Sequence, residues 1–322
     1  MKITIIILVV YQMSILTGQR VGEPCNGGIC TPIEDCPLAS VAGFDNYCDY
    51  SACCPQIKRA FRNSPSGRAC KKYSNTYCKG RPLITNGNIT EKYEFPYMVQ
   101  VGIIQEKSVN ISFGCGGTLI HERYVLTAAH CLQTVEQGPM FVRLGGYNTT
   151  DGVIIEVESR IEHPEHNTTL KINDIALLKL KTRVAVFNNS IMPACLADSS
   201  GSELASFTAT GWGPADVQGT IPTALLKIQL YQLDPKDCDR PFEPINNTAH
   251  ICAGKRNETE VGDVCNADSG GPLAIIHPIS CLGQVFGVVG NGLECTEPQS
   301  TTRHARVFHH LEWIESIVWA KK

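Results

Sequence analysis

The sequence has no large charge imbalance and, outside its N-terminal segment, no long apolar run. Its 322 residues carry a formal net charge of -3, which gives no reason to expect nucleic acid or a membrane surface as a partner. No later stretch reaches the ~18 apolar residues of a transmembrane helix. Repeats and low-complexity segments are also absent. The chain therefore has the composition of a globular protein, long enough for two packed halves and an appendage.

Cysteine, in contrast, is abundant. Sixteen cysteines, an even number, indicate disulfides and an oxidising compartment. Residues 1–18 contain a basic Lys2, an apolar run and small polar residues, the pattern of a secretory signal peptide. We therefore expect a secreted, extracellular protein. Its Asn-x-Ser/Thr sequons are candidate glycosylation sites: Asn88, Asn110, Asn148, Asn167, Asn188, Asn246 and Asn257.

The segment 25–54 holds six cysteines: Cys25, Cys30, Cys36, Cys48, Cys53 and Cys54. So small a module cannot bury enough apolar surface to fold alone, which favours disulfides over a zinc site in an oxidising compartment. The sequence alone does not select among the possible connectivities. Residues 55–83 are basic and polar, with turn-forming residues at 64–67 and no amphipathic period. We expect a mostly irregular linker there.

Three separated motifs suggest a chemistry. Ser269 lies in the stretch Asp263–Pro272, between an aspartate and two glycines. Alone, this stretch is as consistent with a surface turn as with a catalytic serine. Upstream, however, His130 follows Leu126–Ala129, and Asp174 leads into an apolar run. A serine needs a base to become a nucleophile, and histidine, aspartate and serine in this order match one of the known catalytic triads.

The remainder of the chain favours an all-β fold. Short β-rich segments are separated by glycine, asparagine and proline, as in antiparallel barrels or sandwiches. They span Tyr97–Ile103, Val125–Ala128, Phe141–Leu144, Val153–Val157, Ile175–Leu180, Phe207–Thr210 and Val285–Val289. One helix is expected near the C-terminus, where Phe308, Leu311, Ile314, Ile317 and Val318 fall on one face.

With these motifs, residues 84–322 resemble the trypsin/chymotrypsin-like serine proteases. Residues 25–54, which end in a Cys-Cys pair, resemble the clip domain of arthropod clip-domain serine proteases. Leu83, a non-basic residue before Ile84, resembles the Snake-like subgroup. The resemblance implies a double six-stranded antiparallel β-barrel with a C-terminal helix, preceded by a clip domain (25–54) and an activation segment (55–83). It implies no cofactor and no metal.

The resemblance also implies roles for individual residues. His130, Asp174 and Ser269 would be catalytic, and the N–H groups of Ala267 and Ser269 would form the oxyanion hole. Cleavage between Leu83 and Ile84 would free an ammonium that pairs with Asp268. Asp263 would select Arg or Lys, with Gly292 and Thr302 in the pocket wall. Alanine replaces the usual glycine at 267, threonine replaces a wall glycine at 302, and Gly290 and Asn291 replace a serine and an aromatic.

The implied disulfides are Cys25–Cys53, Cys30–Cys48, Cys36–Cys54, Cys115–Cys131, Cys238–Cys252, Cys265–Cys295 and Cys78–Cys195. These leave Cys70 and Cys281, which we pair by elimination. The remaining histidines, among them His163, His166, His309 and His310, fit no zinc motif and are expected at the surface.

The resulting hypothesis is a secreted endopeptidase zymogen that cleaves another zymogen after Arg or Lys in an extracellular immune or developmental cascade. Its partners would be that protein substrate, an upstream activating protease with an apolar preference, and serpin inhibitors. The alternative is a weakly active or non-catalytic homologue that acts as a regulatory scaffold. Ala267, Thr302, Gly290 and Asn291 are the residues that keep this alternative open.

Overall fold

A computed structural model describes 24–25, 28–32, 51–55, 63–78, 92–104, 110–133, 138–213, 222–238, 245–255, 268–276, 280–292 and 301–320. The chain forms two units, residues 1–56 and 57–322. In the first unit, three strands form an antiparallel sheet in the order β1-β2-β3. They are β1 (Pro24–Cys25), β2 (Gly28–Pro32) and β3 (Ser51–Pro55). The three disulfides predicted for the clip segment lie outside what the structure describes.

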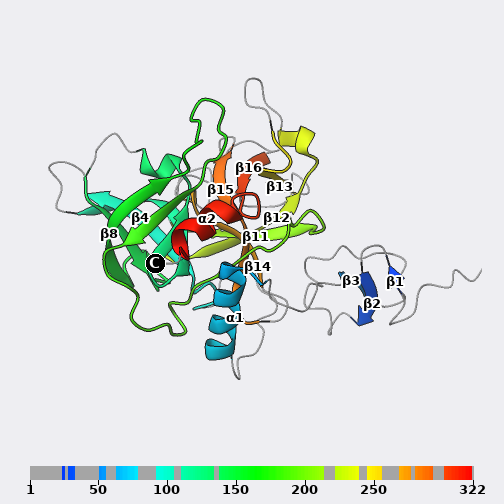
Figure 1. The fold of residues 1–322 in the computed structure, drawn as a ribbon, viewed down its shortest axis with the longest axis horizontal. Helices are drawn as coiled ribbons and strands as arrows, with labels where there is room; N and C mark the ends of the chain where they lie inside the picture. Colours follow the sequence, from blue (N-terminus) through cyan, green and yellow to red (C-terminus); the bar gives the residue numbers. More distant parts are fainter. Residues whose placement is uncertain are drawn as a thin grey trace, which may run out of the picture. The chain divides into compact units, whose positions relative to one another are not determined.

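The second unit begins its sheet structure with a closed barrel, of which Figure 1 labels β4 and β8. The strand order around this barrel is β4-β5-β6-β9-β8-β7. The pairing of β4 with β7 closes this ring. Its strands are β4 (Met98–Ile104), β5 (Ile111–His121), β6 (Tyr124–Thr127), β7 (Met140–Leu144), β8 (Val153–Glu162) and β9 (Ala176–Leu180). A short 3-10 helix, η2 (His130–Leu132), follows β6.

The second barrel runs β15-β14-β11-β12-β13-β16 and closes where β15 pairs with β16. The short β10 adds in parallel to β15 outside this ring. The elements are β10 (Cys195–Leu196), β11 (Ser206–Gly211), β12 (Leu226–Gln232), η3 (Pro235–Cys238), β13 (His250–Gly254), β14 (Pro272–Ile276), β15 (Gly283–Gly292) and β16 (Thr301–Arg306). The predicted double six-stranded β-barrel is therefore confirmed.

Strands near the junction of the barrels are buried on both faces, which explains their continuous apolar sequences. In β6, Val125 packs into the first barrel, whereas its neighbour Leu126 packs into a cluster shared with the second barrel. Leu178 and Leu177 of β9 divide in the same way. Successive side chains of a strand point to opposite faces, so each of these strands contributes to two cores.

The predicted C-terminal helix is α2 (Leu311–Val318). It buries Leu311, Ile314 and Val318 in the cluster that also contains Leu126 and Leu177, so it packs where the two barrels meet. Within the described residues, no helix is both long and apolar enough to cross a membrane.

The expectation of an irregular linker is wrong for residues 65–77, which form helix α1 (Pro65–Tyr77). Ser64 caps its N-terminus by accepting a hydrogen bond from the Gly67 N–H, and Pro65 occupies the first turn. Serine before proline is a helix-start signal, but the same residues also favour turns, so the local sequence does not distinguish the two. Tyr73 and Tyr77 pack edge-on against Phe187 at 5.6 and 5.7 Å between ring centroids.

The two predicted disulfides between the linker and the barrels are also wrong. The structure contains Cys70–Cys195 and Cys78–Cys281 in place of Cys78–Cys195 and Cys70–Cys281. The reason is the helix. Eight helical residues separate its two cysteines by about 12 Å, so they reach different partners, Cys195 in β10 and Cys281 just before β15. The predicted Cys115–Cys131 and Cys238–Cys252 are both present.

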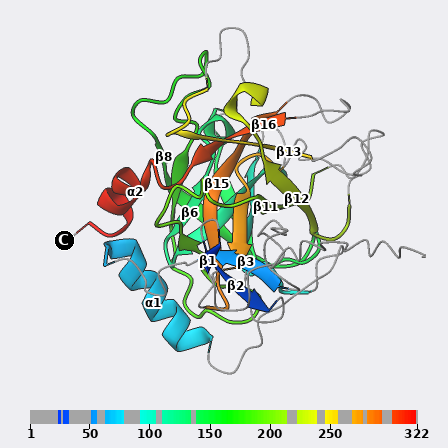
Figure 2. The ribbon, with the colours of Figure 1, turned by 90° about the vertical axis from the view of Figure 1, so that its right-hand side faces the viewer.

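Helix α1 also contacts α2, beside which it lies in Figure 2. Glu315 of α2 accepts hydrogen bonds from the Ser66 hydroxyl, at 2.5 Å, and from the Ser66 backbone N–H, at 3.1 Å. The segment that precedes the barrels in sequence is thus an integral part of their fold.

Candidate active site

The first element of the site is a bonded pair formed by His130 and Asp174. His130 begins η2, and its neighbour Cys131 is tied to Cys115 of β5. The Asp174 carboxylate accepts a hydrogen bond from His130 Nδ1 at 2.7 Å and a second from the His130 backbone N–H at 2.9 Å. Two hydrogen bonds to the same residue fix both the position of the imidazole and the nitrogen that it presents to Asp174.

Asp174 sits at the end of a hairpin between β8 and β9. Asn173 before it has a positive φ of 52°, a conformation that asparagine tolerates better than most residues. The Asn173 amide donates to the Glu165 carbonyl at 3.0 Å, and its oxygen lies 3.1 Å from His310 Nε2. Asn173 therefore connects the hairpin to the start of α2 and holds the turn that presents Asp174.

Ser269 comes from the other barrel. Its carbonyl accepts a hydrogen bond from Gly116 N of β5 at 2.7 Å. The next residue, Gly270, has φ 83°, and a Cβ there would lie 2.3 Å from Thr127 Oγ1. Glycine is therefore required at 270 for both conformation and space. The tight turn brings Ser269 against the first barrel, beside His130.

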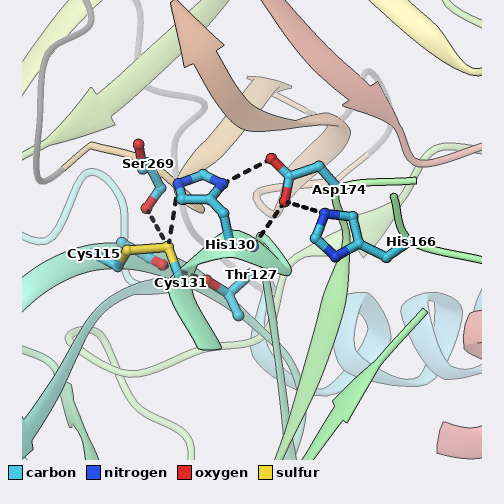
Figure 3. Close-up of a disulfide and its surroundings, with 8 residues drawn as sticks. Cys115, Thr127, His130, Cys131, His166, Asp174 and Ser269 are labelled. Carbon is cyan, nitrogen blue, oxygen red and sulfur yellow. Dashed lines mark hydrogen bonds and ion pairs between the residues drawn. A yellow bond between two sulfur atoms is a disulfide. The ribbon is translucent and has the colours of Figure 1, made fainter. Parts of the chain in front are cut away.

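Figure 3 shows His130 between Ser269 and Asp174. Within the described residues, no hydrogen bond joins the Ser269 hydroxyl to His130; such contacts are often long without substrate. Burial by itself raises the pKa of the Asp174 carboxyl, but hydrogen bonds and positive charge from His130 bring it below its ordinary value. An ionised carboxylate behind an oriented imidazole, with a serine on the far side, is the arrangement needed to generate a serine nucleophile.

Comparison with known proteins agrees with this geometry. The family model described as Trypsin matches residues 84–314. The chain belongs to the trypsin family of serine proteases. It is 30% identical to Serine protease snk of Drosophila melanogaster over 90% of this chain and 71% of the relative. It is 31% identical to Phenoloxidase-activating enzyme 1 of Spodoptera litura, and 30% identical to CLIP domain-containing serine protease B4 of Anopheles gambiae.

The matches to the Spodoptera litura and Anopheles gambiae relatives each cover 73% of this chain. They cover 67% and 70% of those relatives, respectively. Together the relatives place the chain among the clip-domain serine proteases of arthropods, as the motifs predicted. The protein is accordingly a serine endopeptidase by family.

Asp268, the residue before Ser269 in this clip-domain protease, points into the second barrel. Its carboxylate accepts a hydrogen bond from Gly213 N at 2.8 Å. A Cβ at Gly211 would lie only 1.7 Å from its Oδ1, so glycine at 211 makes room for this carboxylate. Leu83 and Ile84, which were predicted to supply its activation partner, lie outside the described residues.

The specificity pocket is described only in part. Asp263, Ala267 and the predicted disulfide Cys265–Cys295 lie outside the described residues, and Gly292 is described by its backbone alone, at the end of β15. Thr302 of β16 is buried; its hydroxyl lies 3.2 Å from the Ala253 carbonyl and 2.6 Å from His304 Nε2. Burial lowers the pKa of His304 to about 3, so its ring is neutral.

The expectation that the remaining histidines lie at the surface is wrong for four of those that the structure describes: His250 and His304 are buried, and so are His310 and the side chain of His166. His310 is 3% exposed and contacts Asn173. The His166 side chain is 2% exposed, and its Nε2 lies 3.8 Å from Asp174 Oδ1. The sequence does not single out His166, because no motif links it to Asp174. The hairpin between β8 and β9 brings the two side chains together.

Proposed function

We propose that the protein is a secreted zymogen whose cleaved form is an endopeptidase, with Ser269 as nucleophile, His130 as general base and Asp174 as the group that orients it. The observation that carries the proposal is the 2.7 Å bond from His130 Nδ1 to Asp174, with Ser269 on the opposite side of the ring (Figure 3). This bond leaves Nε2 as the nitrogen that takes up a proton.

In this mechanism Ser269 Oγ attacks the carbonyl carbon of the scissile peptide while its proton passes to His130 Nε2. The backbone N–H groups of Ser269 and Ala267 would stabilise the oxyanion. His130 then gives the proton to the leaving amine, and a water molecule activated in the same way hydrolyses the acyl-enzyme. Asp174 stays ionised throughout and stabilises the imidazolium.

Activation would follow cleavage between Leu83 and Ile84, by an upstream protease that accepts leucine. The new Ile84 ammonium would pair with Asp268, whose carboxylate is held beside Gly213. The N-terminal fragment would remain attached, since α1 carries the disulfides to Cys195 and Cys281. The position of these two bonds supports an activated enzyme made of two covalently linked chains.

The proposed substrate is another zymogen, cut after Arg or Lys through Asp263, in an extracellular immune or developmental cascade. The names of relatives support the cascade: one is a phenoloxidase-activating enzyme. The described disulfides support an oxidising compartment. Among the described sequons, Asn110, Asn167, Asn188 and Asn246 are exposed, so they are the positions at which we expect glycans. Serpins are the proposed inhibitors.

The experiment is fluorophosphonate labelling of the full chain before and after cleavage at Leu83–Ile84, followed by Edman sequencing of the new N-terminus. We expect labelling only after cleavage, a new terminus reading Ile-Thr-Asn-Gly, and no labelling of Ser269→Ala. Arg, Lys and Phe peptide substrates then test specificity. Absence of labelling in protein verified to be cut would refute the enzyme mechanism and favour the regulatory scaffold.

A further inference from the structure

A second histidine contacts the catalytic aspartate from the side opposite His130. In Figure 3 the His166 ring faces Asp174 while His130 occupies the other side of the carboxylate. His166 Nε2 lies 3.8 Å from Asp174 Oδ1. The His166 side chain is 2% exposed and that of Asp174 8%. A charged or polar pair this deeply buried is screened little by solvent, so its interaction matters for the triad.

The hairpin between β8 and β9 holds His166 in this place. Glu162 at the end of β8 pairs with Ala176 of β9, which closes the hairpin. His163 N donates to the Ile175 carbonyl, and His166 N donates to the His163 carbonyl at 2.9 Å. These backbone bonds form a tight turn that directs the His166 ring inward, toward Asp174.

The other ring nitrogen of His166 is bonded to Glu162. His166 Nδ1 contacts the Glu162 carboxylate closely, and Gln133 Nε2 donates to the same carboxylate at 3.1 Å. His166 therefore has a carboxylate facing each ring nitrogen. Gln133 Nε2 also lies 3.4 Å from His166 Nδ1. Ionised carboxylates only accept hydrogen bonds, so His166 can act on them only through its ring N–H groups. The charge of His166 lowers the pKa of the Asp174 carboxyl, in addition to the larger contribution of His130.

On another side, Asp174 shares a small pocket with Lys171, His250, Arg303 and Gly290. A Cβ at Gly290 of β15 would lie 3.8 Å from Asp174 Oδ2. That Cβ would, however, lie 2.5 Å from the Arg303 carbonyl, so the local backbone excludes a side chain at 290. His130 and His166 are the side chains shown to form a hydrogen bond or an ion pair with the Asp174 carboxylate.

We propose that His166, held by Glu162, is a positioning residue of this protease: it orients Asp174, and through Asp174 it places His130 against Ser269. The proposal rests on the catalytic roles given above. Titratable groups around His166 are Glu162 on β8, Asp174 before β9, His130 on η2, and His163 and Glu165 in its own turn.

The test measures the rate constant of fluorophosphonate labelling of the cleaved full chain between pH 5 and pH 9, for wild type, His166→Leu, His166→Gln and Glu162→Gln. Labelling depends on the triad and little on the specificity pocket. We expect His166→Leu to slow labelling about 10-fold or more. We expect His166→Gln to recover much of this rate, because the glutamine amide also offers an N–H group to Asp174.

Controls are Glu165→Gln, which removes the same charge as Glu162→Gln from an exposed position in the same turn, and His309→Gln, an exposed histidine. Both should leave rate and pH profile unchanged. Thermal unfolding of each variant detects a general loss of fold. Equal rates in wild type and His166→Leu would overturn the proposal, as would a loss of rate in His166→Leu that His166→Gln does not recover. An unreactive cleaved wild type would instead refute the proposed function itself, and the proposal with it.

Discussion

The disulfide between Cys78 and Cys281 should contribute substantially to the free energy of unfolding. The length of the loop that it closes determines the size of this contribution. With Cys70–Cys195 intact, the bond closes a ring that runs from Cys70 to Cys78 and from Cys195 to Cys281. That ring holds roughly 90 residues, for which the chain-entropy model gives about 4–5 kcal/mol. The double variant Cys78→Ser/Cys281→Ser should therefore lower the Tm by roughly 10 °C or more.

The assay is thermal unfolding of the zymogen under non-reducing conditions, with peptide mapping to verify the remaining bonds. A matched control is Cys70→Ser/Cys281→Ser, which removes one cysteine from each of two different bonds. It leaves Cys78 and Cys195 unpaired and should be less stable than the first variant. Recovery of a Cys78–Cys195 peptide from the wild type would refute the pairing, and an unchanged Tm in the first variant would refute the estimate.

Three further changes test the site and its surroundings. Gly270→Ala places a Cβ 2.3 Å from Thr127 Oγ1 at φ 83°, so labelling of Ser269 should fall by about 100-fold or more; normal labelling would show that the turn adapts. Thr302→Gly should speed hydrolysis of Arg substrates more than it changes labelling, and equal effects would place Thr302 away from the pocket. His304 has its pKa lowered to about 3 by burial, so it is neutral in the folded protein at pH 5 but protonated in the unfolded chain. The free energy of unfolding should therefore fall between pH 6.5 and pH 3, by about 2 kcal/mol at pH 5, and denaturant titrations of His304→Gln should lose this part of the pH dependence.

Much of the architecture follows from local sequence patterns. Each β-rich segment that the sequence predicts coincides with a strand. Short apolar runs and alternating apolar residues, bounded by turn-forming residues, are typical of strands that are buried on one or both faces. The C-terminal helix follows from its apolar face. The strands that were not predicted, such as β5 and β16, contain glycines, serines or buried polar residues, and are strands because neighbouring strands complete their hydrogen bonds.

The triad could be located from sequence because each of its members lies in a recognisable motif. Ser269 is surrounded by residues that permit a tight turn, and His130 and Asp174 each border an apolar strand. What the motifs could not provide is the distance between them. The 2.7 Å bond from His130 to Asp174 depends on η2 and the β8–β9 hairpin meeting.

Tertiary structure alone decided the disulfide partners of α1 and the environment of His166. Cys70 and Cys78 are close in sequence, and only the helix that separates them assigns one to Cys195 and the other to Cys281. His166 has no motif of its own; it is buried between Glu162 and Asp174 because the hairpin closes around it. Local patterns specify elements, whereas pairings between distant residues depend on how those elements pack.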